Sequence, residues 1–184
     1  MTKFKTKNLV MCSLFAALIA IGAFIQIPVP MMDYFTLQLL FVLLAGLLLG
    51  PIQGAISAAI YVAIGLVGFP IFAAGGGILY IFRPSFGYLL GFIAGAFLAG
   101  FVCNKLRARK FKHYLIAAFS GMIITYIIGF AYKFIILNFY MNDPTSLWIV
   151  ISASLIGIDI PGDIVLSIIS AMIAVKVNKA LGNA

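Results

Sequence analysis

Apolar residues form long continuous stretches along this chain, rather than the strict alternation expected of half-exposed strands. A helix that crosses a membrane needs about 20 mostly apolar residues. Six stretches approach this length: residues 9–27, 35–50, 52–68, 86–104, 114–139 and 162–179. The pattern therefore predicts an all-α integral membrane protein, in which residues 1–184 form a single domain of six transmembrane helices.

Two apolar segments need separate interpretation. Residues 147–160 are too few for a span, so we expect a re-entrant or interface-lying piece there. Residues 9–27 follow three lysines, as the hydrophobic region of a secretory signal does. This stretch is longer than such a region and further spans follow it, so we expect it to be retained as the first helix.

The composition agrees with a membrane protein. Of the 184 residues, 65% are hydrophobic and only 9% are charged, and the mean hydropathy is +1.22. A soluble domain carries about 25% charged residues, and a disordered chain has few apolar ones. The net charge of +8 would suit nucleic acid, but basic residues beside membrane spans are normally topology signals.

The basic residues indicate the orientation. In a six-span arrangement, ten of the twelve basic residues and both termini lie on the same side of the membrane. The positive-inside rule makes this side cytoplasmic. These ten are Lys3, Lys5, Lys7, Lys105, Arg107, Arg109, Lys110, Lys112, Lys176 and Lys179. A seventh span would move the last two outside, which argues against it.

The remaining charged residues lie toward the outer connections, 28–34, 69–85 and 140–161. They are Asp33, Asp143, Asp159, Asp163, Arg83 and Lys133. Charged groups at membrane depth usually face a cavity or pair with one another. Arg83 and Lys133 could instead extend to lipid headgroups, and Asp163 could simply favour the start of its helix. We interpret Asp33 and Asp143 as solvated loop residues.

The connection at 69–85 is long and apolar, and it contains Gly75, Gly76 and Gly77. Neither water-exposed loops nor lipid-exposed irregular backbone are built in this way. We therefore expect a Gly-rich outer loop, between the third and fourth helices, that folds over the bundle as a lid. The glycines would let the backbone approach a ligand, or they would form a hinge.

Two further groups of residues allow a structural and a functional interpretation. Thr36 and Gln38 at the start of the second span supply uncharged donors and acceptors, for a ligand or for helix capping and packing. Ala16 and Ala20 make a smooth helix face, either for internal packing or for docking a partner protein.

Motifs of catalysis are missing from the sequence. It has no P-loop pattern, no HExxH, and a single histidine, His113, so we expect neither ATP hydrolysis nor a Ser-His-Asp site. Cys12 and Cys103 lack metal-ligand spacing. We therefore expect no enzyme, no metal and no bound cofactor.

An ordered set of motifs resembles the BioY family, the biotin-binding S components of energy-coupling factor (ECF) transporters. The motifs are residues 35–38 (FTLQ), 44–51 (LAGLLLGP), 68–70 (GFP) with the glycine triplet, 86–92 (FGYLLGF) and 161–163 (PGD). The resemblance implies six helices in a bacterial cytoplasmic membrane and a vitamin site near the outer face. It also implies a transmembrane coupling subunit that docks on Ala16 and Ala20, and two cytoplasmic ATPases.

Biotin has ureido N–H groups, an apolar ring and a carboxylate tail. Asp163 could accept the ureido N–H bonds, while Gln38 or a glycine N–H could donate to the ureido carbonyl. Apolar contacts to the biotin ring could come from Phe72, Tyr80 and Tyr88. Many family members carry a basic residue one turn after the aspartate, where this chain has Leu166, so the sequence favours Arg83 before Lys133 as partner of the tail carboxylate.

Alternatives remain at this point. The substrate could instead be a related acid such as lipoate, whose carboxylate would pair with the same cation but which has no ureido group. A transporter acting alone could couple to protons through Asp159 or Asp163. A membrane scaffold without a ligand is the third interpretation.

Overall fold

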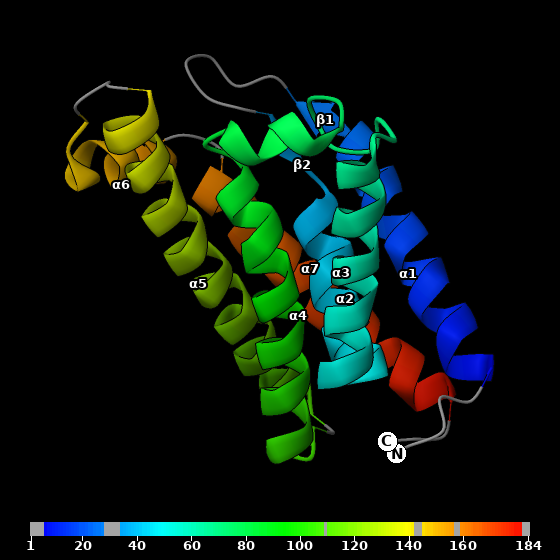
Figure 1. Ribbon diagram of the computed structural model, residues 1–184. Helices are drawn as coiled ribbons and strands as arrows, with labels where there is room; N and C mark the ends of the chain where they lie inside the picture. Colours follow the sequence, from blue (N-terminus) through cyan, green and yellow to red (C-terminus); the bar gives the residue numbers. More distant parts are fainter. Residues whose placement is uncertain (1–5, 28–33, 109, 142–144, 157–158, 182–184) are drawn as a thin grey trace.

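The computed structural model describes residues 6–27, 34–108, 110–141, 145–156 and 159–181. This part of the chain is almost entirely helical (Figure 1). In chain order the elements are α1 (Thr6–Phe24), β1 (Gln26–Ile27), β2 (Phe35–Thr36), α2 (Gln38–Leu49), α3 (Pro51–Val67), the 3-10 helix η1 (Ile78–Phe82), α4 (Phe86–Lys105), α5 (Phe111–Ile135), the π-helical η2 (Ile136–Tyr140), α6 (Leu147–Ile156) and α7 (Asp159–Ala180).

Each predicted span coincides with a helix. Within the described residues, four helices are long and apolar enough to cross a membrane: α1, α4, the continuous helix Phe111–Tyr140, and α7. The other two, α2 and α3, are apolar but have only 12 and 17 residues. They are separated at Gly50, which has a φ of 87°, and Pro51 follows at the start of α3, where a missing N–H costs nothing.

The predicted ends of the first two spans are wrong by a few residues. The chain leaves α1 at Phe24, and Gln26 and Ile27 then pair with Thr36 and Phe35 in a short antiparallel ribbon. The second helix therefore begins at Gln38 rather than at 35. Pairing between backbone segments leaves no mark in a hydropathy pattern.

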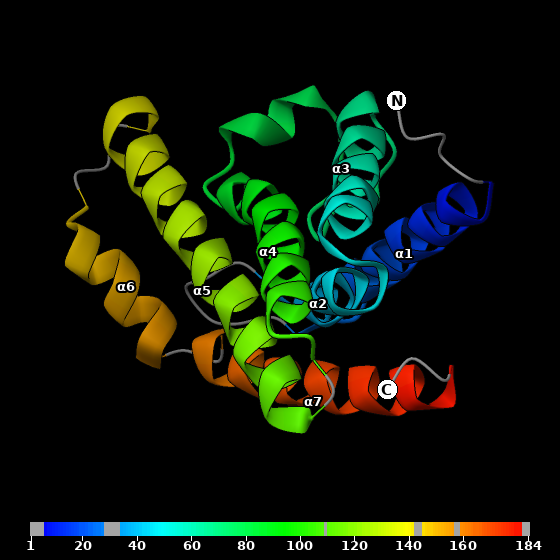
Figure 2. The same cartoon turned by 90° about the horizontal axis from the view of Figure 1, so that it is seen from below.

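The predicted short piece at 147–160 contains α6, a helix of 10 residues. Figure 2 shows that α6 lies at the edge of the bundle beside α5. The last long helix begins at Asp159 rather than at 162, so Pro161 and Asp163 belong to its first turns.

The helix that corresponds to the fifth predicted span is also longer than predicted. It starts at Phe111 and continues as η2 to Tyr140. The side chain of Asn138 donates to the carbonyls of Phe134 and Thr145, at 3.0 and 2.9 Å. Its oxygen accepts a bond from the backbone N–H of Thr145, at 3.2 Å. These bonds fix the end of the helix to the chain that follows.

Helices α4 and α5 pack closely because the residues between them are small. A Cβ atom added at Gly91 would lie 2.7 Å from the carbonyl oxygen of Thr125. The hydroxyl of Thr125 shares its single proton between the carbonyls of Gly91 and Gly121, at 3.1 and 2.9 Å. Without a hydrophobic driving force between helices in lipid, such close contacts and hydrogen bonds hold a bundle together.

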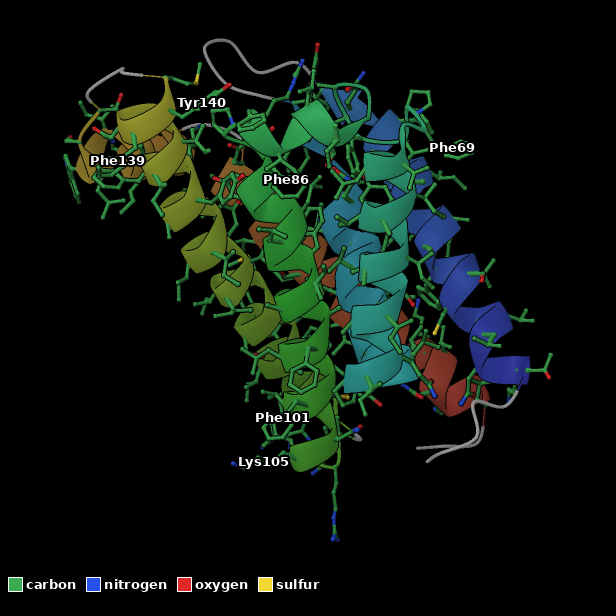
Figure 3. The ribbon with its side chains drawn as sticks, viewed as in Figure 1. Phe69, Phe86, Phe101, Lys105, Phe139 and Tyr140 are labelled. Atoms are coloured by element: carbon green, nitrogen blue, oxygen red, sulfur yellow. The ribbon has the colours of Figure 1, made fainter. Side chains whose placement is uncertain are left out.

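The two ends of the bundle differ in charge. The start of α1, the α4–α5 connection and the end of α7 share one end, at the bottom of Figure 1. Figure 3 shows Lys105 at this end and Phe69, Phe86 and Tyr140 at the other. The described basic residues at the first end, called the basic end below, are Lys7, Lys105, Arg107, Lys110, Lys112, Lys176 and Lys179. Lys3, Lys5 and Arg109 lie outside the described residues.

Replacing Gly95 with valine should destabilise the fold. Its new side chain would collide with the hydroxyl of Thr125 and approach the carbonyl oxygen of Gly121, 2.9 Å from the Cβ position. Overpacking of this kind costs about 1–3 kcal/mol, so we expect a lower melting temperature in detergent. Ala63→Val, on an exposed face of α3, is the matched control. Equal melting temperatures for the two variants would contradict the close α4–α5 contact.

Candidate functional site

A cavity lies at the end of the bundle opposite the basic end. Its walls come from β2, α2, the connection between α3 and α4, and the adjoining ends of α4, α5 and α7. The lining residues are Tyr34, Phe35, Thr36, Gln38, Leu39, Ala73, Ala74, Tyr80, Ser85, Tyr88, Leu89, Phe92, Thr125, Tyr126, Lys133, Asp159 and Asp163. The volume of this cavity, taken as the space open to the centre of a water molecule, is about 100 Å³. A few polar groups among aromatic walls are typical of a small-molecule site.

Asp163 is held by a tyrosine from another helix. The hydroxyl of Tyr126 on α5 donates to Oδ2 of Asp163 on α7, at 2.7 Å. The Tyr126 ring is 7% exposed and meets the rings of Tyr88 and Phe130 at centroid distances of 5.7 and 5.3 Å. The carboxylate therefore has a fixed position at an aromatic wall.

A chain of hydrogen bonds supports the opposite wall. The hydroxyl of Thr36 donates to the side-chain oxygen of Gln38 at 3.0 Å, and the amide nitrogen of Gln38 donates to the hydroxyl of Tyr61 at 2.5 Å. Tyr61 in turn donates to the carbonyl of Ile71 at 3.1 Å. The buried amide of Gln38, 4% exposed, thus links α2 and α3 to the apolar connection.

The connection between α3 and α4 crosses the end of the bundle that holds the cavity (Figure 1). Phe72 packs between Tyr61 and Tyr80, with ring centroids 5.4 and 4.6 Å away. The hydroxyl of Tyr132 on α5 donates to the carbonyl of Ile81 at 2.5 Å. These contacts fix η1, and with it Tyr80, over the helices.

The glycine triplet determines the backbone conformation of this connection without lining the cavity. Gly75 and Gly77 have φ values of 111° and 99°, and the backbone N–H of Gly77 donates to the carbonyl of Gly65 at 2.7 Å. A Cβ at Gly76 would collide with the carbonyl of Phe69. Among the described lining residues the neighbouring alanines, Ala73 and Ala74, reach the cavity and the three glycines do not.

The structure brings most of the predicted site residues together. Seven of them line the cavity: Thr36, Gln38, Tyr80, Tyr88, Lys133, Asp159 and Asp163. Phe72 does not line it; it is 2% exposed and supports Tyr80 from behind.

Arg83, which the sequence favoured over Lys133, lies outside the cavity. Its side chain is exposed, and its guanidinium sits 5.4 Å from the centre of the Tyr80 ring. Arg83 is thus absent from the described lining residues, whereas Tyr80 and Lys133 are among them.

Sequence reasoning missed ten lining residues: Tyr34, Phe35, Leu39, Ala73, Ala74, Ser85, Leu89, Phe92, Thr125 and Tyr126. Most are apolar or aromatic, which are common residue types throughout this chain. Tyr126 carried a usable signal, because it precedes Lys133 by seven residues and so shares its helix face.

Other predicted residues lie elsewhere. Ala16 is buried at 5% exposure, whereas Ala20 is partly exposed. Asp33 and Asp143 lie outside the described residues. Cys12 and Cys103 are buried free thiols, and among the described residues no cluster of His, Cys, Asp and Glu could hold a metal ion.

Long apolar helices around a cavity with aromatic walls define a multi-pass membrane protein with room for a small polar molecule. The BioY family model matches residues 1–183, and the chain belongs to this family.

Its relatives are named as biotin transporters. The probable biotin transporter BioY of Lysinibacillus sphaericus is 41% identical over 97% of this chain and 90% of its own. The biotin transporter BioY of Thermotoga maritima is 35% identical, over 94% of this chain and 96% of its own. The crystal structure of the S-component for biotin from an ECF-type ABC transporter matches with a TM-score of 0.83 and 28% identity, over 97% and 94% of the two chains.

Tyr61→Phe should loosen the wall formed by the connection. It leaves the Gln38 amide and the Ile71 carbonyl without their buried partner, which costs about 1–3 kcal/mol. We expect faster hydrogen exchange over residues 71–77 and a lower melting temperature. Tyr140→Phe removes the same hydroxyl from an exposed ring, 57% exposed, and should change neither. Unchanged exchange in Tyr61→Phe would show that the hydrogen-bond chain is not what holds the wall.

Proposed function

We propose that this protein is the S component of an ECF-type transporter and captures biotin at the outer face of the membrane for ATP-driven uptake. The observation that carries the proposal is the carboxylate of Asp163, held 2.7 Å from the Tyr126 hydroxyl in an aromatic cavity. The fold around it matches the S-component for biotin with a TM-score of 0.83. The relatives' names point to the same substrate.

The cavity offers the groups that biotin needs at its ring end. Asp163 accepts ureido N–H bonds, and bonds to an ionised acceptor are about twice as strong as neutral ones. The second N–H of the Gln38 amide can donate to the ureido carbonyl. Tyr80, Tyr88 and Phe92 supply apolar faces for the fused rings.

The orientation follows from the charges. With six spans, the basic end lies in the cytoplasm together with both termini, as the positive-inside rule requires. The cavity at the opposite end then faces outward, and the apolar Gly-rich connection between α3 and α4 covers it as an outer loop. This placement suits capture before transport and a bacterial cytoplasmic membrane.

Transport against a gradient needs an energy source that this sequence lacks. No P-loop pattern is present to bind the phosphates of ATP. A transmembrane coupling subunit and two cytoplasmic ATPases would supply it. The partly exposed Ala20 of α1 can contribute to the docking face, together with neighbours that lie on the same side of the helix.

Binding of biotin to the purified protein, measured by calorimetry, tests the proposal. We expect Asp163→Asn to weaken binding at least about tenfold, because its amide N–H₂ would face the ureido N–H groups donor to donor. Tyr126→Phe keeps the carboxylate but removes the hydroxyl that positions it, so we expect it to lose less affinity than Asp163→Asn does.

The competing acid in this experiment is lipoate, which has a carboxylate tail and no ureido group. Lipoate should displace biotin only weakly from the wild type. Stronger binding of lipoate than of biotin would make lipoate the substrate, and absence of binding for both would overturn the capture function.

Cysteine labelling from outside intact cells tests the orientation. The two native thiols are buried and can be replaced by alanine. We expect a cysteine at Leu79, which is 75% exposed, to react with a membrane-impermeant maleimide. A cysteine at Lys110, at the exposed basic end, should react only after the membrane is opened. The reverse pattern would place the cavity on the cytoplasmic side.

A further inference from the structure

We propose that Lys133 binds the carboxylate of the captured acid and that its place on α5 sets the length of tail which the cavity accepts. This inference rests on the proposed capture of biotin. It concerns the end of the ligand opposite the ureido ring, for which the fold match and the relatives' names give no contact.

One face of α5 carries both ends of the site. Tyr126 and Lys133 line the cavity, and seven residues bring a helix almost through two full turns, so both side chains leave α5 on the same side. At 1.5 Å per residue they are separated by about 10 Å along the helix axis. This separation suits a molecule with a hydrogen-bonding ring at one end and an acid at the other.

Between these two residues, α5 itself contributes no side chain on this face. Gly129 lies between them on the same face, and a Cβ there would fall 2.6 Å from the ring of Tyr88. The Tyr88 ring therefore lies directly against the backbone of α5 and forms the wall of the cavity along this stretch. A ligand that reaches from Asp163 to Lys133 would follow this aromatic wall.

Tyr132, which precedes Lys133, makes contacts outside the cavity lining. Tyr132 turns toward α4 and η1, where a Cβ added at Gly87 would touch its side chain and its hydroxyl bonds to Ile81. Successive residues on a helix point about 100° apart. Lys133 therefore leaves α5 on a different side from Tyr132, and it lines the cavity.

Charge also favours Lys133. Of the lining residues that the structure describes, it alone is positively charged, beside the acidic Asp159 and Asp163. Arg83, the other cation at this end, has its guanidinium 5.4 Å from the Tyr80 ring centre, and its exposed side chain is not among the residues that line the cavity. A carboxylate inside the cavity would therefore meet Lys133 first.

The test compares an acid with its uncharged amide. Biotin and biotinamide are titrated into purified wild-type protein, Lys133→Gln, Lys133→Arg and Arg83→Gln. We expect the wild type to prefer biotin at least about tenfold, since the amide cannot pair with the ammonium. Lys133→Gln should lose this preference while it still binds biotinamide normally, which also shows that it is folded. Lys133→Arg should restore much of the preference, and Arg83→Gln should keep it.

Tail length is tested with norbiotin and homobiotin, one methylene shorter and longer than biotin. Both should bind the wild type more weakly than biotin, and Lys133→Gln should level the three affinities. An unchanged acid preference in Lys133→Gln, or its loss in Arg83→Gln, would overturn the inference while leaving biotin capture intact. A wild type that binds neither biotin nor biotinamide would overturn the proposed function and this inference with it.

Discussion

The hydrogen bond between Tyr126 and Asp163 is the interaction on which the cavity depends. A carboxylate among apolar helices is tolerated only where the protein provides donors or access to water. Here the donor comes from α5 and the acceptor from α7, at 2.7 Å, so one bond joins two helices and satisfies a charged group. The same bond fixes the Tyr126 ring against Tyr88. Solvation of the charge and the shape of the aromatic wall are therefore coupled, and neither can change without the other.

Close packing of α4 on α5 makes this arrangement possible. Gly91 and Gly95 on α4 face Gly121 and Thr125 on α5, and the Thr125 hydroxyl bonds to carbonyls of both helices. In lipid, helices gain little from hiding apolar surface, so association relies on such small residues and hydrogen bonds. Thr125 directly precedes Tyr126 along α5. The contact that holds the two helices together thus also determines how far Tyr126 lies from the wall on α4.

Hydropathy and charge predicted the long helices and most of the polar residues of the site, because each of these stands out locally. A run of apolar residues needs only its own length to be recognised, and Asp163 and Lys133 are conspicuous as isolated charges in such runs. The β1–β2 pairing escaped prediction because it joins backbone segments on either side of residues 28–34. Tyr126 was missed because an aromatic residue within a span looks like core packing. The sequence favoured Arg83 over Lys133, whereas Lys133 lines the cavity and Arg83 does not, because only the three-dimensional arrangement shows which cation reaches it.

The distribution of charge among helices has a physical consequence for recognition. Leu166 lies one turn after Asp163 and is buried at 5% exposure. A cation there would lie beside the carboxylate and compete with a ligand for its oxygens. With a leucine instead, Asp163 keeps Tyr126 as its hydrogen-bond donor, and the positive charge of the cavity comes from Lys133 on α5. The hydrogen-bond acceptor and the cation thus lie at different places along the cavity. This arrangement favours a molecule whose hydrogen-bond donors and negative charge are separated in the same way, because each end then loses water against a group of complementary charge.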